Sequence, residues 1–342
     1  MKSRVVYFDI LNILACFAVL LLHHNGIVHY YDVNSLAWKQ SLAFEVLFYW
    51  AVPVFFMLTG ATLLDYRDKY TTKQFFYKRL LRAIFPFLLW SVILLIYTWF
   101  VKDTFPYKNI KSIFDAIILT KLPYGEVYWF FIPLISLYCF IPVLSLLKDN
   151  KNILWYIVIF IFITHSVLSV LFNLIGIRYN YSLQFPMGGY IIFLVLGYLF
   201  SKIELSKKQR IVIYILGGGM LLFRYFVTYY YSLQDGKVNR IVFGYTQFHS
   251  VILALAIFVF IRYMVSGTEF FTKNGRVFSL LSSCSLGIYL IHKLVMNYEL
   301  LVLNIKPDNV YWRFLGAFLT YTICLLIVFF IKKIPYLKRI FP

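Results

Sequence analysis

Histidine is the residue type in this chain that offers acid–base chemistry most directly, and two of the six histidines close an apolar segment. Residues 7–24 read YFDILNILACFAVLLLHH, so His23 and His24 follow a long apolar run. A histidine within a membrane-length helix is costly unless it has a partner or a function. Because imidazole exchanges protons near neutral pH, this segment predicts a proton-transfer group at one end of a membrane helix.

Helical geometry separates the two histidines. At about 100° per residue, Asp9, Asn12, Cys16 and His23 fall along one stripe, while His24 is rotated by about 100° from His23. Asn12 and His23 are about 16 Å apart along the axis, roughly half the hydrocarbon thickness. The stripe predicts a path from an inner binding region to an outer chemical centre. The alternative is that Asp9 and Asn12 only cap the start of the helix.

The other four histidines are His29, His165, His249 and His292. If the amino terminus is cytoplasmic, none of them lies on the cytoplasmic side, which predicts a polar cavity that opens outward. For His29, His165 and His249 taken singly, a satisfied hydrogen bond between helices is the favoured interpretation. His292 lies in the middle to outer half of the predicted ninth span.

The elements that position these residues are membrane helices. The chain has 342 residues, of which 62% are hydrophobic, with a mean hydropathy of +0.78, far more apolar than a soluble domain of this length. We predict an all-α, polytopic membrane protein in which residues 1–342 form a single transmembrane domain. Ten apolar runs are long enough to cross the hydrocarbon core. They cover about residues 7–27, 43–64, 80–101, 127–147, 153–175, 187–203, 209–231, 247–265, 278–301 and 313–332.

Charge predicts the orientation of these spans. Most of the 33 lysine and arginine residues fall in the segments that a cytoplasmic amino terminus would place inside, which predicts that both termini are cytoplasmic. The net charge of +19 then reflects topology and attraction to anionic membrane lipids, and we expect no nucleic-acid partner. The four cysteines lie within predicted spans without metal-ligand spacing, so we expect neither a disulfide framework nor a metal site.

Five sequences in order carry a family resemblance: DILNILACFAVLLLH, VPVFFMLTGATLL, KRLLRAIFP, EVYWFF and SLGIYLIHKLV. They resemble the successive motifs of the membrane acyltransferase 3 family across nearly the whole chain. The resemblance implies a bacterial protein of the cytoplasmic membrane that O-acylates, most often O-acetylates, surface polysaccharides and related glycans.

The same resemblance implies roles for individual residues. The family's essential first-span histidine falls on His23, and its ninth-span histidine falls on His292. The arginine that precedes the first histidine by eleven positions falls on Asn12, so this chain departs from the family's donor-side contact. The family's basic motif falls on Arg79 and Arg82. Some relatives also carry a histidine two residues before the fourth-span tryptophan, where this chain has valine.

Charge supplies an independent argument for the donor. Lys78, Arg79 and Arg82 form a predicted cytoplasmic cluster, and Arg79 and Arg82, three residues apart, share a helix face. Arginine suits phosphate, and acyl-CoA carries several phosphates, so we predict acyl-CoA as the donor substrate with no permanently bound cofactor. Asn12 is included among the donor-binding residues. Ordinary positive-inside anchoring is the alternative for the basic cluster.

Acyl transfer from a thioester to a hydroxyl needs a base, groups that stabilise an oxyanion, and exclusion of water. We predict His23 as the base or acyl relay and His292 as its partner in catalysis. Trp129, Tyr289, Arg224 and Glu126 are predicted on the acceptor side, where Glu126 has interfacial placement as its alternative. The acceptor is predicted to be a polysaccharide or lipid-linked glycan. The competing hypothesis is a transporter or flippase that exports a glycan or lipid-linked sugar.

Overall fold

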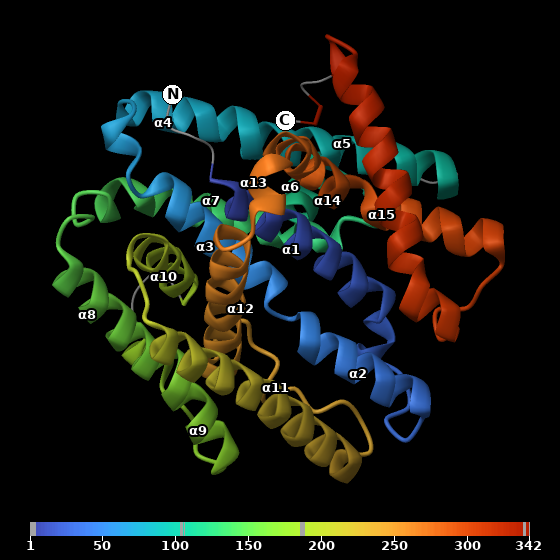
Figure 1. Cartoon of the computed structure of the whole chain (residues 1–342). Coiled ribbons are helices and arrows are strands. Elements are labelled where there is room, and N and C mark those ends of the chain that lie inside the picture. Colours follow the sequence, from blue (N-terminus) through green and yellow to red (C-terminus); the bar gives the residue numbers. More distant parts are fainter. Residues whose placement is uncertain (1–4, 103–104, 106, 185–188, 338–339, 342) are drawn as a thin grey trace.

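All regular structure in the described part of the chain is helical. The computed structural model describes residues 5–102, 105, 107–184, 189–337 and 340–341, and it contains no strand among them. Figure 1 shows the helices gathered around α1 (Val6–His24), which contacts α3 (Ala51–Leu63), α12 (Phe248–Ser266), α14 (Gly275–Leu303) and α15 (Val310–Lys333). The helix that carries the proposed chemistry therefore lies in the interior of the bundle.

Nine helical stretches in the described residues are long and apolar enough to cross a membrane. Besides α1, α12, α14 and α15 they are: α2 (Leu36–Phe48) with α3; α4 (Thr72–Arg79), η3 (Leu80–Ile84) and α5 (Phe85–Lys102); η4 (Glu126–Phe130) with α7 (Phe131–Leu144); α8 (Lys151–Ile161), η5 (Phe162–Val167) and α9 (Leu168–Leu174); and α11 (Lys207–Asp235). Shorter elements are η1 (Gly26–His29), η2 (Tyr66–Asp68), α6 (Ile110–Ile118), η6 (Tyr181–Leu183) and α13 (Glu269–Lys273).

The sixth of the ten predicted spans, residues 187–203, contains α10 (Tyr190–Lys202), a helix of 13 residues. Residues 187 and 188 lie outside the described part of the chain. Thirteen helical residues reach only about 20 Å, against about 30 Å of hydrocarbon, so α10 is shorter than the nine long helical stretches. Residues 191 to 195 have almost no exposed surface, so α10 lies in the interior of the bundle.

Two glycines explain how α10 reaches the core. A Cβ atom added at Gly60 of α3 would lie 1.8 Å from the Leu194 carbonyl oxygen, and one added at Gly197 of α10 would lie 2.0 Å from the Met57 carbonyl oxygen. The two helices therefore touch backbone to backbone, as small residues permit in membrane proteins.

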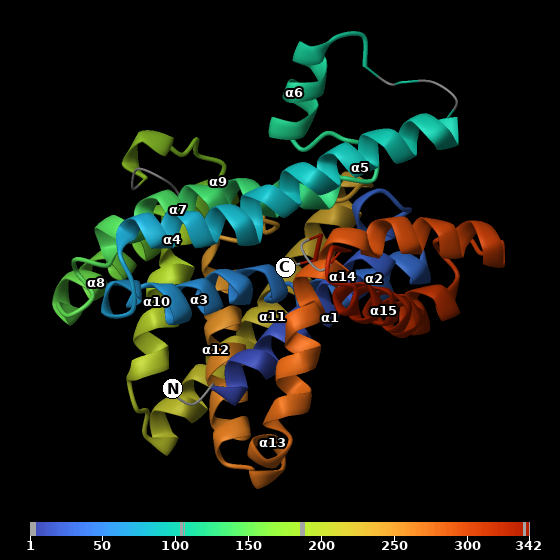
Figure 2. The ribbon, with the colours of Figure 1, turned by 90° about the horizontal axis from the view of Figure 1, so that it is seen from above.

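A long helical stretch formed by α4, η3 and α5 runs along one side of the bundle, and α6 stands away from the body next to α5 (Figure 2). The stretch begins at a capping box between Thr71 and Gln74, which satisfies the first backbone N–H groups. Its middle, η3, is a π-helical segment, and such segments often occur at functional sites because they re-aim side chains. Arg79 directly precedes this segment, and Arg82 lies within it.

Candidate active site

Four cavities follow one another along α1, α3 and α14. The arginine cavity is lined by Arg79, Arg82, Asp9 and Asn12 among others, and the serine cavity by Ser282, Ser283 and Ser285. The histidine cavity is lined by His23, His29, Glu45 and Tyr49, and the lysine cavity by Lys293, Asn297, Glu126 and Tyr124. Their volumes are about 310, 310, 370 and 500 Å³, in the order given.

Shared lining residues join these cavities into one row. Asn12, Phe55, Phe130, Ser282 and Leu286 border both the arginine and the serine cavity. Tyr289 borders both the serine and the histidine cavity, and His23 and Trp129 border both the histidine and the lysine cavity. The row therefore runs from the two arginines to His23, and Tyr289 stands at the junction halfway along it.

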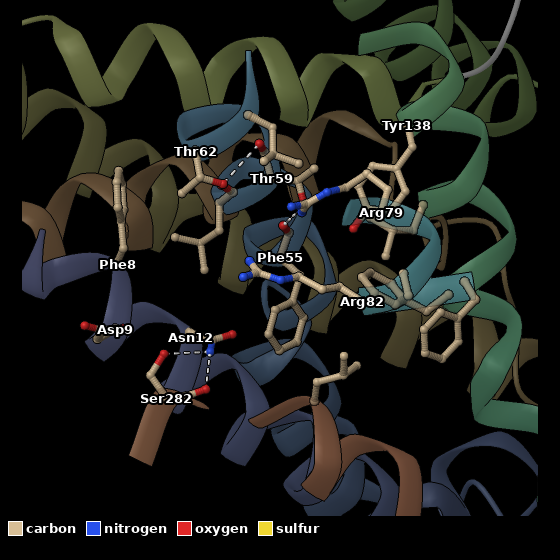
Figure 3. Close-up of a pocket in the computed structure, with 17 residues that line it drawn as sticks. Phe8, Asp9, Asn12, Phe55, Thr59, Thr62, Arg79, Arg82, Tyr138 and Ser282 are labelled. Carbon is tan, nitrogen blue, oxygen red and sulfur yellow. Dashed lines mark hydrogen bonds between the residues drawn. The ribbon is translucent and has the colours of Figure 1, made fainter. Parts of the chain in front are cut away.

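The arginine cavity brings together two elements that are distant in the sequence (Figure 3). Arg79 and Arg82 reach into it from the α4–η3 stretch, opposite Asn12 of α1. The Arg79 guanidinium lies 5.7 Å from the ring centroid of Tyr138, and its Nε has no hydrogen-bond partner among the described residues. Lys78 does not belong to this lining, since its ammonium lies 3.8 Å from the ring centroid of Tyr70.

Asn12 links α1 to α14 at the entrance to the serine cavity. Its Nδ2 donates to the carbonyl oxygen and to Oγ of Ser282, both at 2.9 Å. The Oγ of Ser285, which borders the same cavity, is buried without a hydrogen-bond partner in the described structure. Buried polar atoms normally find partners, so this hydroxyl retains unused hydrogen-bonding capacity. Cys16, placed on the same stripe by sequence, is buried instead and donates to the carbonyl oxygen of Ser285.

His23 and His292 face each other from α1 and α14. Their ring centroids are 5.2 Å apart, with 34° between the ring planes. Nδ1 of His292 lies 2.6 Å from the carbonyl oxygen of Tyr289. A carbonyl only accepts, so this contact places the proton on Nδ1 and leaves Nε2 as an acceptor. Nε2 is buried and has no hydrogen-bond partner among the described residues.

His24 takes a different side of α1, as helix rotation predicts. Its Nδ1 lies 3.2 Å from the carbonyl oxygen of Trp312 and its Nε2 lies 2.9 Å from Oγ1 of Thr320. Thr320 also contacts Oε2 of Glu299 at 2.5 Å, while Oε1 of Glu299 has no partner among the described residues. These contacts tie the end of α1 to α14 and α15. His23 lines the histidine and lysine cavities and His24 lines neither, while both histidines line a further cavity with Lys293.

An aromatic stack forms one wall of the histidine cavity. The rings of Tyr49 and Tyr245 are nearly parallel at 4.1 Å, and those of Tyr245 and Trp129 stack at 5.4 Å. Tyr49 also donates a hydrogen bond to the carbonyl oxygen of Phe243. Desolvation among these groups raises the pKa of Tyr245 well above its ordinary value, so its phenol stays neutral at physiological pH.

Arg224 lies behind this wall. Its Nη2 lies 3.4 Å from Oε1 of Glu45, its Nε donates to the carbonyl oxygen of Val242 at 3.0 Å, and its guanidinium lies 3.5 Å from the ring centroid of Tyr49. Arg224 is 1% exposed and is not among the described residues that line the histidine cavity. The partner expected for an intramembrane arginine is therefore Glu45, and Arg224 supports two residues of the lining from outside.

The structure thus brings most of the sequence-predicted site residues onto one row. His23, Tyr289 and Trp129 line the histidine cavity, Glu126 lines the lysine cavity, and His292 contacts His23. Sequence reasoning missed Tyr245, Ser285 and Lys293. A lysine inside a span carries its own signal, because such charges are rare. No sequence pattern identifies Tyr245, because its position in the histidine cavity depends on the conformation of the segment that connects α11 to α12.

Comparisons with known proteins give one match. A protein-family model described as an acyltransferase domain matches residues 5–329, nearly the whole chain. No curated protein and no solved structure matches the chain significantly.

Proposed function

The chain belongs to the acyltransferase 3 family, and on that premise we propose that it moves an acyl group from acyl-CoA to a hydroxyl of a glycan across the membrane. The observation that carries this proposal is the row of cavities between the arginine pair and His23. Acyl-CoA is a cytoplasmic metabolite, so the arginine cavity faces the cytoplasm in this proposal. Both termini are then cytoplasmic, in agreement with the charge distribution.

The donor is bound by charge at one end and by hydrogen bonds along its arm. Arg79 and Arg82 bind the phosphates of acyl-CoA, because guanidinium groups match phosphate in charge and geometry. The arm of the donor carries amides, and it passes Asn12, Ser282 and the unpartnered hydroxyl of Ser285. A neutral asparagine suffices at position 12, where the family has arginine, because amides need hydrogen bonds more than charge.

The chemistry takes place where the row meets His23. The imidazole of His23 takes the proton of the acceptor hydroxyl, whose oxygen attacks the thioester carbonyl and forms the new C–O bond. The tetrahedral intermediate then collapses, the C–S bond breaks, and the imidazolium returns its proton to the leaving thiolate. His292, with Nε2 as an acceptor beside His23, orients the first imidazole and stabilises its charged form. Burial of the pair in the bundle limits hydrolysis by water.

Family analogy sets the remaining expectations. Acetyl is the expected acyl group, and a surface polysaccharide or its lipid-linked precursor is the expected acceptor. The bacterial cytoplasmic membrane is the expected location.

The test uses purified full-length protein in lipid nanodiscs with labelled acetyl-CoA and a panel of glycans. We expect label in the glycan fraction with the wild type and a loss of at least about 100-fold with His23→Ala. The control is His165→Asn, which changes a histidine outside the row of cavities. Transport of glycan without any acyl transfer would favour the exporter hypothesis. Full transfer by His23→Ala would contradict the proposed mechanism.

A further inference from the structure

The lysine cavity lies on the far side of His23 from the donor route. It is the largest of the four cavities described, at about 500 Å³, and it shares only His23 and Trp129 with the histidine cavity among their described lining residues. None of the described residues of the arginine and serine cavities belongs to it. A ligand in this cavity therefore meets His23 without occupying the space that the proposed function gives to the donor.

Two local structures aim its polar groups inward. Glu126 and Trp129 are three residues apart in η4, a 3₁₀ helix, in which side chains at this spacing project to the same side. Lys293 and Asn297 are four residues apart on α14 and share a helix face. η4 and α14 therefore each direct two side chains into the lysine cavity.

Tyr124, which also lines the lysine cavity, has an unusual backbone conformation. Its φ of +62° lies in the left-handed region, which a bulky residue other than glycine seldom adopts. Its ring packs against Tyr97 with centroids 5.5 Å apart. Such a conformation persists only when the surroundings enforce it, and it is concentrated at functional sites. The strained backbone places a second aromatic ring in the cavity that already holds Trp129.

The chemistry of the lining selects a class of ligand. Glu126 accepts hydrogen bonds, the Lys293 ammonium donates them, and the Asn297 amide does both. The single carboxylate and the single ammonium balance in charge, so the lining favours neither an anion nor a cation. Tyr124 and Trp129 offer faces to C–H-rich ring surfaces. This combination fits an uncharged, hydroxyl-rich ring and does not fit an alkyl alcohol.

We propose that the lysine cavity is the acceptor subsite, and that it holds an uncharged sugar ring with one hydroxyl directed at His23. Lys293, Asn297 and Tyr124 then become acceptor-binding residues beside Glu126 and Trp129. This inference rests on the proposed function, because it takes His23 as the group that receives the hydroxyl proton. It adds the location of the acceptor and its chemical class.

The test measures binding and transfer separately. Binding of methyl glucoside, methyl glucuronide and octanol to the full-length protein in nanodiscs is measured by saturation-transfer NMR without acyl-CoA. Transfer from labelled acetyl-CoA is then measured for the same three compounds. Glu126→Gln, Lys293→Met and Asn297→Leu are compared with Lys111→Met, which removes an exposed lysine on α6 outside the cavity.

We expect methyl glucoside to bind and accept best, and we expect each cavity variant to raise its KM about tenfold while the KM of acetyl-CoA stays unchanged. Lys111→Met should match the wild type. Preference for octanol or methyl glucuronide, or cavity variants that alter only the acetyl-CoA KM, would overturn the inference. If methyl glucoside binds in a Lys293-dependent manner but no acyl transfer occurs, the proposed function fails and the sugar subsite stands.

Discussion

The imidazoles of His23 and His292 lie 5.2 Å apart between ring centroids, at the point where the row of cavities reaches the end of α1. His23 borders the cavities, whereas His292 is fully buried behind it with Nδ1 on the Tyr289 carbonyl oxygen. The imidazole that borders the cavities is thereby assigned to the substrate hydroxyl, and the fully buried imidazole is assigned to positioning. This division of roles leads to the first prediction.

The variants His292→Asn and His292→Ala distinguish a role of His292 in positioning His23 from a role in packing alone. The amide nitrogen of asparagine can replace Nδ1 as the donor to Tyr289, but it offers nothing in place of Nε2. We expect His292→Asn to keep the melting temperature close to wild type and yet lose activity about 100-fold, and we expect the same loss of activity for His292→Ala. Nanodisc melting and acyl-transfer rates give the two readouts. Recovery of activity in His292→Asn would show that the residue only holds the local structure.

The arginine pair predicts a donor effect that depends on phosphate. Arg79→Gln and Arg82→Gln should each raise the KM for acetyl-CoA about tenfold or more, because each removes charge-assisted hydrogen bonds. Neither should change the rate with acetyl-pantetheine, which lacks the nucleotide. Lys78→Gln is the matched control, because Lys78 lies beside Tyr70 and outside the described lining of the arginine cavity. If the two arginine variants lost the same activity with acetyl-pantetheine as with acetyl-CoA, the arginines would stabilise the fold rather than bind the nucleotide.

Arg224 predicts a change in stability. Arg224→Met leaves the Glu45 carboxylate buried without its cation, which costs about 3–5 kcal/mol and should lower the melting temperature strongly. A second substitution, Glu45→Gln, should recover part of that loss, because it removes the uncompensated charge. Melting curves of the two single variants and the double variant measure the coupling. Strictly additive losses would mean that the two side chains do not stabilise each other.

The contact between α3 and α10 predicts intolerance of a single methyl group. Gly60→Ala places a carbon atom against the Leu194 carbonyl oxygen and should cost about 1–3 kcal/mol or more. Gly218→Ala on α11 is the control, because an added Cβ there meets nothing within 4 Å, and we expect it to be neutral or slightly stabilising. Equal melting temperatures for the two variants would contradict the backbone contact between these helices.

The sequence predicts this fold well where apolar length decides the structure. Nine predicted spans correspond to long helices, and the divergence of His23 and His24 follows from helix rotation alone. The sixth predicted span contains α10, whose 13 described residues are fewer than those of the predicted segment 187–203. Apolar composition predicts that such a helix exists but does not fix the residues at which it begins and ends.

The site is predicted less completely than the fold, and the reason is geometric. Residues at fixed helical spacing, such as Asn12 and His23, can be placed on a common face from the sequence alone. The pairing of Arg224 with Glu45 joins helices 179 positions apart in the chain, and the stack of Tyr245 on Trp129 depends on a connecting segment. No local pattern encodes such contacts. These long-range contacts determine which of the predicted residues line the cavities and which only contact the lining residues.

The most direct test of a path that ends at His23 is transfer across a sealed membrane. Purified protein is reconstituted into proteoliposomes that enclose a neutral glycan, and labelled acetyl-CoA is added only outside. Vesicles with the arginine cavity exposed to the outside should acylate the enclosed glycan, and the same vesicles made with His23→Ala should not. Acylation that requires donor and glycan on the same side, or that continues in His23→Ala vesicles, would contradict the account.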